Sequence, residues 1–219
     1  MGAALPRDPD LIIFDCDGVL VDSETLSAQV TQRVMADLGC ELSLSETLEH
    51  FAGSSTEVFH ARAADLLGRT LEADWDREYA TWYEDALRTG LQPVPGIHQA
   101  LSELSHPRCV ASNSSHQRIR ASLDATDLLA HFGDRIYSAQ DVERGKPEPD
   151  LFLLAASRTG VEPERCVVVE DSVFGVRAAR AAGMRVLAFA GVTAAGRLAG
   201  ERTVVFDSMA DLPRLIGTV

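Results

Sequence analysis

Two pairs of acidic residues stand where apolar, strand-like runs of the sequence end. The segment Asp15-Cys16-Asp17-Gly18 follows Leu11–Phe14, and Glu170-Asp171 follows Cys166–Val169. A turn after the first run and a helix cap after the second are the plain structural explanations. Ligands of parallel sheets bind at the carboxyl ends of the strands, however. Carboxylates there would suit a hard cation such as Mg²⁺, and one of them could be a covalent nucleophile for a phosphoryl group.

Three further polar residues occupy similar positions. Lys146 lies in Gly145-Lys146-Pro147-Glu148-Pro149-Asp150 and is the only lysine among 20 lysines and arginines, which suggests a site that needs a compact ammonium. Ser112 and Asn113 follow another apolar run, where a hydroxyl and the N–H groups of a helix start can bind an anion. A solvated lysine and a simple helix N-cap are the alternatives. The combined set of groups is typical of phosphoryl transfer, which depends on positioning and charge stabilisation.

The elements that must position these residues alternate between strand and helix, which predicts a doubly wound α/β sheet. Helices are expected at about 95–105, 115–124, 149–160 and 173–182. Six runs are candidate strands, and most of them are continuous and rich in β-branched residues, as in strands buried on both faces of a parallel sheet: Leu11–Asp15, Cys109–Asn113, Ile136–Ala139, Cys166–Asp171, Met184–Ala190 and Thr203–Phe206.

A long segment without strands interrupts this alternation. Residues 20–90 are expected to form a helical insertion, and Pro93 and Pro95 mark its end. The core would then comprise residues 1–19 and 91–219. Within the insertion, four segments have amphipathic helical periodicity: Glu24–Leu38, Leu44–Phe51, Thr56–Leu67 and Glu72–Arg88.

Composition restricts the partners. A net charge of −13 argues against nucleic acid and anionic membranes, and no apolar run is long enough to cross a bilayer. Four cysteines without a CxxC pair fit a reducing cytoplasm. We expect a cytoplasmic monomer or weak homodimer whose partner is a small phosphorylated metabolite. Its site must supply its own positive charge.

Together these motifs resemble the haloacid dehalogenase superfamily of phosphohydrolases, from Leu11 to about Gly191. The first motif, which extends through Val19-Leu20-Val21-Asp22-Ser23-Glu24, and the Lys146 loop are similar to the sugar-phosphate phosphatase and β-phosphoglucomutase branch. The resemblance implies a Rossmann-like α/β core with an inserted α-helical cap domain. It also implies Mg²⁺ as cofactor and hydrolysis of a sugar phosphate or sugar-acid phosphate.

The resemblance also assigns roles to individual residues. Asp15 would be the nucleophile that becomes an aspartyl-phosphate, and Asp17 would be the general acid and then the general base. Asp15, the backbone carbonyl of Asp17, Asp171 and Glu170 would hold the metal. The phosphoryl oxygens would be bound by Gly18, Ser112, Asn113 and Lys146, and Lys146 would also lie near the nucleophile.

Differences between this sequence and related branches of the superfamily restrict the reactions that the chain is expected to catalyse. Asp17 argues for phosphate esters, because true dehalogenases lack an acid at this position. The insertion contains no lysine, which excludes a phosphonatase that needs a cap lysine for a Schiff base. A receiver-type signalling domain would place its acids on different strands and lack so large an insertion. A catalytically dead binding module is disfavoured because no catalytic position is substituted.

The main alternative is a β-phosphoglucomutase-type isomerase, which shares the core motifs. These mutases carry a His on the first cap helix and an Arg in a cap loop, where this chain has Ser27 and Thr56. Without that arginine, a second phosphate would lose charge-assisted hydrogen bonds, so hydrolysis is expected, although Arg62 could substitute. The loop Gly53-Ser54-Ser55-Thr56 is the expected specificity loop of the cap.

Overall fold

The computed structural model describes residues 8–217 except 53 and 55. The chain divides into two compact units, which are described separately below. One unit runs to Val21 and resumes at Gln92, and the other, here called the helical unit, is Asp22–Leu91. The helical unit starts two residues later and ends one residue later than the expected insertion.

The larger unit is built on a six-stranded parallel sheet, so the predicted fold class is confirmed. The strand order is β3-β2-β1-β4-β5-β6, which places β1 between β2 and β4 in the middle of the sheet. All six expected strands are present: β1 (Leu11–Phe14), β2 (Arg108–Ser112), β3 (Ile136–Ser138), β4 (Cys166–Glu170), β5 (Arg185–Phe189) and β6 (Thr203–Phe206).

The central strands are apolar because both of their faces are covered. Leu11 and Ile13 of β1 pack in one buried cluster with residues of α7 (Asp150–Thr159) and α8 (Val173–Ala181). Phe14, which falls on the opposite face of the strand, contacts the ring of Phe132 with a centroid separation of 5.9 Å. A continuous apolar strand is what a sheet buried on two sides requires.

The remaining helices of the larger unit precede, connect or follow the strands. They are α5 (Ile97–Glu103), α6 (His116–Ala125), α9 (Ala195–Leu198) and α10 (Leu212–Ile216), with short 3₁₀ turns η2 (Leu129–His131), η3 (Ala139–Asp141), η4 (Pro163–Arg165) and η5 (Met209–Asp211). α9 and α10 are too short to have given a periodic signal in the sequence. Across residues 8–52, 54 and 56–217, no helix has both the length and the apolarity needed to span a membrane.

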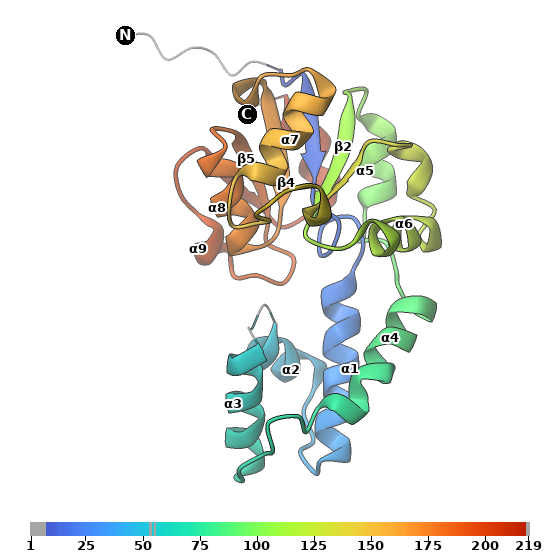
Figure 1. Ribbon diagram of the computed structural model, residues 1–219, viewed down its shortest axis with the longest axis vertical. Helices are drawn as coiled ribbons and strands as arrows, with labels where there is room; N and C mark the ends of the chain where they lie inside the picture. Colours follow the sequence, from blue (N-terminus) through green and yellow to red (C-terminus); the bar gives the residue numbers. More distant parts are fainter. Residues whose placement is uncertain (1–7, 53, 55, 218–219) are drawn as a thin grey trace. The chain divides into compact units, whose positions relative to one another are not determined.

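The helical unit contains α1 (Ser23–Asp37), α2 (Leu44–Phe51), α3 (Thr56–Leu67), η1 (Arg77–Tyr79) and α4 (Ala80–Thr89) (Figure 1). Side-chain caps fix two of the helix starts. Asp22 accepts from the backbone N–H of Thr25 at 3.1 Å, and Ser43 and Glu46 form a reciprocal capping box.

One expected helix of this unit is shorter than predicted. Glu72–Arg88 was expected to be continuous, but the helix begins only at Ala80, after turns and the 3₁₀ segment η1. Contacts with α3 account for the difference. The Trp75 ring stacks on Phe59 at 5.9 Å, and Asp76 bonds to His60 at 2.9 Å. Tertiary contacts therefore override helical periodicity here.

Candidate active site

The middle position of β1 brings the sequence motifs together at one edge of the sheet. Phe14 is in register with Val110 of β2 and with Val169 of β4. Asp15, the next residue, therefore lies level with the end of β4, and its N–H donates to the carbonyl of Val169 at 2.9 Å. This register puts Asp15 between the polar residues that end β2 and β4.

Lys146 binds two of the predicted acids. Its Nζ donates to Oδ1 of Asp15 at 2.6 Å and to Oε1 of Glu170 at 2.8 Å. The Lys146 side chain is only 4% exposed, and Nζ also lies 4.8 Å from the centre of the Phe152 ring. The only lysine of the chain is thus a buried partner of two carboxylates and not a surface residue.

Burial and charge set the proton affinities of this cluster. Burial raises the pKa of Asp15 to about 7; the Lys146 ammonium opposes this rise, and Glu170 adds to it. Burial alone would lower the pKa of Lys146, but Asp15 and Glu170 outweigh it and raise this pKa above its ordinary value. Lys146 therefore stays charged at neutral pH.

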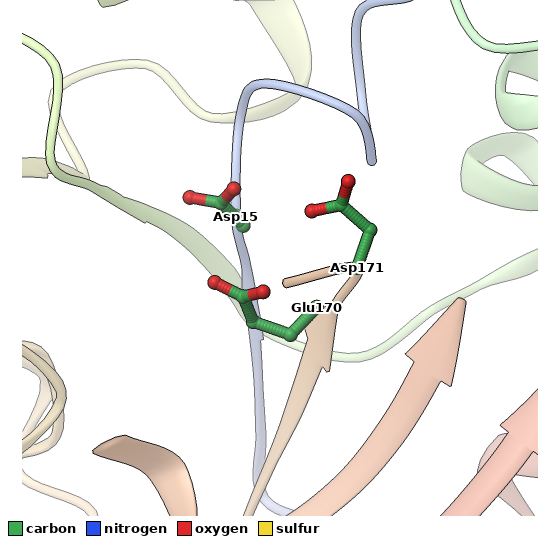
Figure 2. A group of neighbouring side chains, drawn as sticks. All are labelled: Asp15, Glu170 and Asp171. Carbon is green, nitrogen blue, oxygen red and sulfur yellow. The ribbon is translucent and has the colours of Figure 1, made fainter. Parts of the chain in front are cut away.

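Three carboxylates converge beside this lysine. Asp15, Glu170 and Asp171 each offer an oxygen atom, and these atoms lie within 4.8 Å of one another (Figure 2). All three residues are buried. Three clustered carboxylates are the ligands that a hard divalent cation prefers, so the residues present fit the predicted Mg²⁺. The expected fourth ligand, the backbone carbonyl of Asp17, remains a prediction.

Two glycines make room for these carboxylates. Gly18 has a φ of +78°, and a Cβ added to it would lie 2.0 Å from Oδ2 of Asp171. A Cβ on Gly175, in the first turn of α8, would lie 1.7 Å from Oε1 of Glu170. Gly18 is thus packed against Asp171, and its predicted contact with the phosphoryl group remains a prediction. Gly175 was not singled out from the sequence.

Ser172 donates two hydrogen bonds to the Glu170 carboxylate. Both its backbone N–H and its hydroxyl donate to Oε2 of Glu170, at 2.7 and 2.9 Å. The same hydroxyl accepts from Gly175 N at 3.0 Å as the N-cap of α8. The helix-cap explanation is thus correct for Ser172, and the cap also orients a site carboxylate.

The side chain of Asn113 is engaged with the Lys146 peptide. Its Oδ1 accepts from Lys146 N at 2.9 Å, and its Nδ2 donates to Lys146 O at 3.0 Å. Asn113 therefore positions the lysine loop through its side chain, which leaves its backbone N–H for the predicted phosphate contact. Ser112 Oγ accepts from Ser114 N at 3.1 Å, which leaves the Ser112 hydroxyl proton for an anion.

Asp17 points to a different set of partners. Ser114 Oγ donates to Oδ2 of Asp17 at 2.8 Å, and Arg118 Nη2 donates to Oδ1 at 3.3 Å. Sequence reasoning missed both donors. Arg118 lies on α6 one turn after its N-cap Ser115, and this spacing from the second motif is the signal that could have indicated it.

These residues surround a cavity of about 280 Å³. Phe174 also lines it and is 62% exposed, which no pattern in the sequence indicated. The remaining predicted residues belong to the helical unit. Of the expected specificity loop, Gly53 and Ser55 lie outside the described residues. The lining residues of the cavity are Asp15, Asp17, Ser112, Asn113, Ser114, Lys146, Glu170, Ser172 and Phe174.

This fold and this edge of the sheet define a haloacid dehalogenase-like hydrolase. The model of that family matches residues 12–189, so the chain belongs to it. The match includes both acid pairs, the lysine loop and the helical unit. Membership in a hydrolase family removes the receiver-domain alternative.

Known relatives include phosphatases. The chain is 27% identical to the 6-phosphogluconate phosphatase of Escherichia coli over 94% of both chains. It is 33% identical to the fructose-1-phosphate phosphatase of Escherichia coli, over 79% of this chain and 92% of the relative. A crystal structure of a family hydrolase from Deinococcus radiodurans, with bound phosphate and sodium, is 35% identical with a TM-score of 0.81, over 94% of this chain and 93% of that one.

Proposed function

We propose that this protein is a Mg²⁺-dependent phosphatase that hydrolyses a small phosphorylated metabolite through an aspartyl-phosphate on Asp15. The observation that carries the proposal is the buried Lys146, bound to Asp15 and Glu170 beside Asp171. An ammonium and a cation site next to the same carboxylate bring an anionic substrate to a nucleophile that would otherwise repel it.

In the first half-reaction, a carboxylate oxygen of Asp15 attacks phosphorus and the ester P–O bond breaks. The leaving alcohol oxygen takes its proton from Asp17. Ser114 and Arg118 each donate to one oxygen of Asp17 in this structure, and each oxygen keeps a second lone pair that can carry the proton for the leaving oxygen. Lys146, Ser112 and the N–H of Asn113 hold the phosphoryl oxygens.

In the second half-reaction, Asp17 takes a proton from water and the water oxygen attacks phosphorus. The bond between phosphorus and Asp15 breaks, which releases inorganic phosphate and restores the carboxylate. Mg²⁺, when bound, supplies charge stabilisation at the phosphoryl group. It would be held by Asp15, Asp171, Glu170 and the backbone carbonyl of Asp17.

The substrate class follows from the relatives. Their names indicate a sugar-acid phosphate and a ketose phosphate. Both are phosphate monoesters of small polyhydroxylated molecules, so we place the substrate of this chain in the same class.

The test is hydrolysis of p-nitrophenyl phosphate by the purified protein with Mg²⁺. Asp15→Asn keeps the shape of the side chain and removes the nucleophile, so we expect about a thousandfold loss of kcat or more. Retention of wild-type activity by this variant would overturn the covalent mechanism.

A mutase is the second candidate because Arg62 reaches the predicted specificity loop. Its Nη1 donates to Ser54 Oγ at 3.1 Å and to the carbonyl of His50. To distinguish the two reactions, β-glucose 1-phosphate is incubated with enzyme, Mg²⁺ and a trace of glucose 1,6-bisphosphate. We expect free phosphate, since these contacts already engage Arg62. Glucose 6-phosphate forming faster than phosphate would establish the mutase.

A further inference from the structure

Arg118 stands at a helix position that ordinarily disfavours a cation. α6 begins after the N-cap Ser115, so Arg118 is the third residue of the helix. This position favours Glu or Gln, which can return a hydrogen bond to the N-cap, and the positive end of the helix dipole repels a cation there. α2 of the same chain follows the rule, with Ser43 as N-cap and Glu46 as third residue. Arg118 therefore depends on a partner outside its own helix.

The partner of Arg118 is Asp17, the predicted general acid and base. Arg118 Nη2 donates to Oδ1 of Asp17 at 3.3 Å, between residues 101 positions apart in the sequence. Ser114, next to the N-cap of α6, donates through Oγ to the other oxygen, Oδ2, at 2.8 Å. One donor on each oxygen fixes the plane of this carboxylate, whereas the χ2 angle of a free aspartate varies over a broad range.

The start of α6 is itself held in place. Ser138 Oγ donates to the carbonyl of Ser114 at 2.7 Å. His116 N donates to Oε1 of Gln140 at 3.1 Å, and Nε2 of His116 lies 2.9 Å from Oδ1 of Asp141. These three partners belong to the end of β3 and to η3, which follows it. The segment that supplies both donors is thus anchored to the sheet.

The ion pair between Arg118 and Asp17 lies where it adds little to stability. Its side chains are 46% and 24% exposed, and partly exposed ion pairs contribute little to the free energy of unfolding. The same helix carries a second pair of this kind, Arg120 with Asp134 at 3.4 Å, whose arginine is 45% exposed. The two pairs differ in their acids. Asp17 lines the phosphoryl cavity, whereas Asp134 is fully exposed.

We propose that Arg118 is a positioning residue for proton transfer. Together with Ser114 it orients Asp17, so that a free lone pair of the carboxylate faces the leaving oxygen in the first half-reaction and water in the second. The inference rests on the proposed phosphatase function. The proton passes from Asp17 to the leaving alcohol as the ester P–O bond breaks, and from water to Asp17 as the bond between phosphorus and Asp15 breaks. Because proton transfer requires hydrogen-bond reach, loss of Arg118 should weaken these steps and leave phosphate binding intact.

Two aryl esters that differ in their need for a proton test the proposal. p-Nitrophenolate leaves readily without protonation, whereas phenolate is a stronger base and gains more from a general acid. Arg118→Gln removes the guanidinium and supplies a side chain that a capping box prefers at this position, so α6 should keep its start. We expect kcat/KM, which reports formation of the aspartyl-phosphate, to fall about tenfold or more for phenyl phosphate and about threefold or less for p-nitrophenyl phosphate.

Hydrolysis of the intermediate gives a second readout. Asp17 should also serve water less well in Arg118→Gln, so the aspartyl-phosphate accumulates. For p-nitrophenyl phosphate, kcat and KM should then fall together, while their ratio changes little. A smaller fraction of folded enzyme would instead lower kcat at constant KM, and weaker phosphate binding would raise KM for both esters alike. Either of these two results would overturn the inference.

Arg120→Gln is the matched control. It removes the same charge from the same helix and from a pair whose arginine has nearly the same exposure. All of the kinetic parameters should stay at their wild-type values. Equal effects of Arg118→Gln and Arg120→Gln would show a general effect of charge and overturn the role of Arg118.

The wild-type protein separates this inference from the one on which it rests. If the wild type does not turn over p-nitrophenyl phosphate, or if turnover survives Asp15→Asn, the phosphatase proposal fails and the inference fails with it. Turnover that depends on Asp15, with kcat/KM lowered equally for both esters by Arg118→Gln, would overturn the inference alone.

Discussion

Gly175→Ala should damage the site although Gly175 is not expected to contact substrate. Its Cβ would lie 1.7 Å from Oε1 and 1.9 Å from Cδ of Glu170, far inside van der Waals contact. α8 is fixed by its Ser172 cap and by buried residues such as Val176, so the carboxylate must move instead of the helix. Glu170 would then leave Lys146 and the donors of Ser172.

The size of the effect follows from which contacts are lost. Glu170 is fully buried and Lys146 nearly so, and breaking a buried ion pair typically costs about 3–5 kcal/mol. Alanine is favoured over glycine inside a helix by about 1 kcal/mol, which offsets only part of this cost. Lys146 also keeps Asp15, so we expect a net loss of stability of about 2–3 kcal/mol. For catalysis, misplacement of a group by about 1 Å can cost roughly a hundredfold in rate.

The assay compares Gly175→Ala with Gly196→Ala, a helical glycine in α9 whose added Cβ would meet nothing within 4 Å. Gly175→Ala should lower kcat/KM for p-nitrophenyl phosphate about a hundredfold and lower the thermal midpoint by about 5–10 °C. Gly196→Ala should keep wild-type activity and melt at the same temperature or slightly higher. If the two variants behave alike, the packing of Glu170 against α8 does not control the site.

Two further perturbations address Lys146 and the cation. Lys146→Arg preserves the charge but should lower kcat about a hundredfold or more, because a planar guanidinium does not fit the space between Asp15 and Glu170; wild-type turnover would show that only charge matters. EDTA should abolish hydrolysis and Mg²⁺ should restore it, and Asp171→Ala should raise the Mg²⁺ concentration needed for half-maximal activity about tenfold or more. Full activity in EDTA would refute a role for the metal.

The parallel sheet could be predicted because each of its strands can be recognised from its own short segment of sequence. Runs such as Val167–Val169 are apolar on both faces, and their ends carry polar residues that have no place in a core. The segment before α4 could not be predicted in the same way. Trp75 and Tyr79 follow a helical spacing, but Trp75 stacks on Phe59, a contact between α3 and a distant turn. Periodicity carries no information about such partners.

The site shows the same division between local and distant information. Sequence motifs indicated Asp15, Lys146 and the two acids at the end of β4, because each motif is short and lies at or after the end of a strand. The supporting residues depend on packing between elements. Asn113 was assigned to phosphate, yet its amide holds the peptide of Lys146, 33 residues away. The sequence gives no reason to single out Gly175, because its role depends on the position of the Glu170 carboxylate.

The charges at the site imply that cation binding and phosphate binding are coupled. Three carboxylates surround one ammonium, so the ionised cluster has a net charge of −2, and a phosphate monoester adds nearly −2 more. Burial raises the pKa of Asp15, and the negative charge of Glu170 adds to this rise. A divalent cation on Asp15 and Asp171 offsets the excess of negative charge, and the cation also favours the ionised form of the nucleophile.

Mg²⁺ should therefore tighten the binding of inorganic phosphate about tenfold or more. Phosphate should tighten the binding of Mg²⁺ by the same factor, because coupling between two bound ligands is reciprocal. Calorimetric titrations of each ligand, with and without the other, measure both factors. Phosphate affinity independent of Mg²⁺ would mean that Lys146 and the helix N-termini bind the anion without help from the carboxylate cluster.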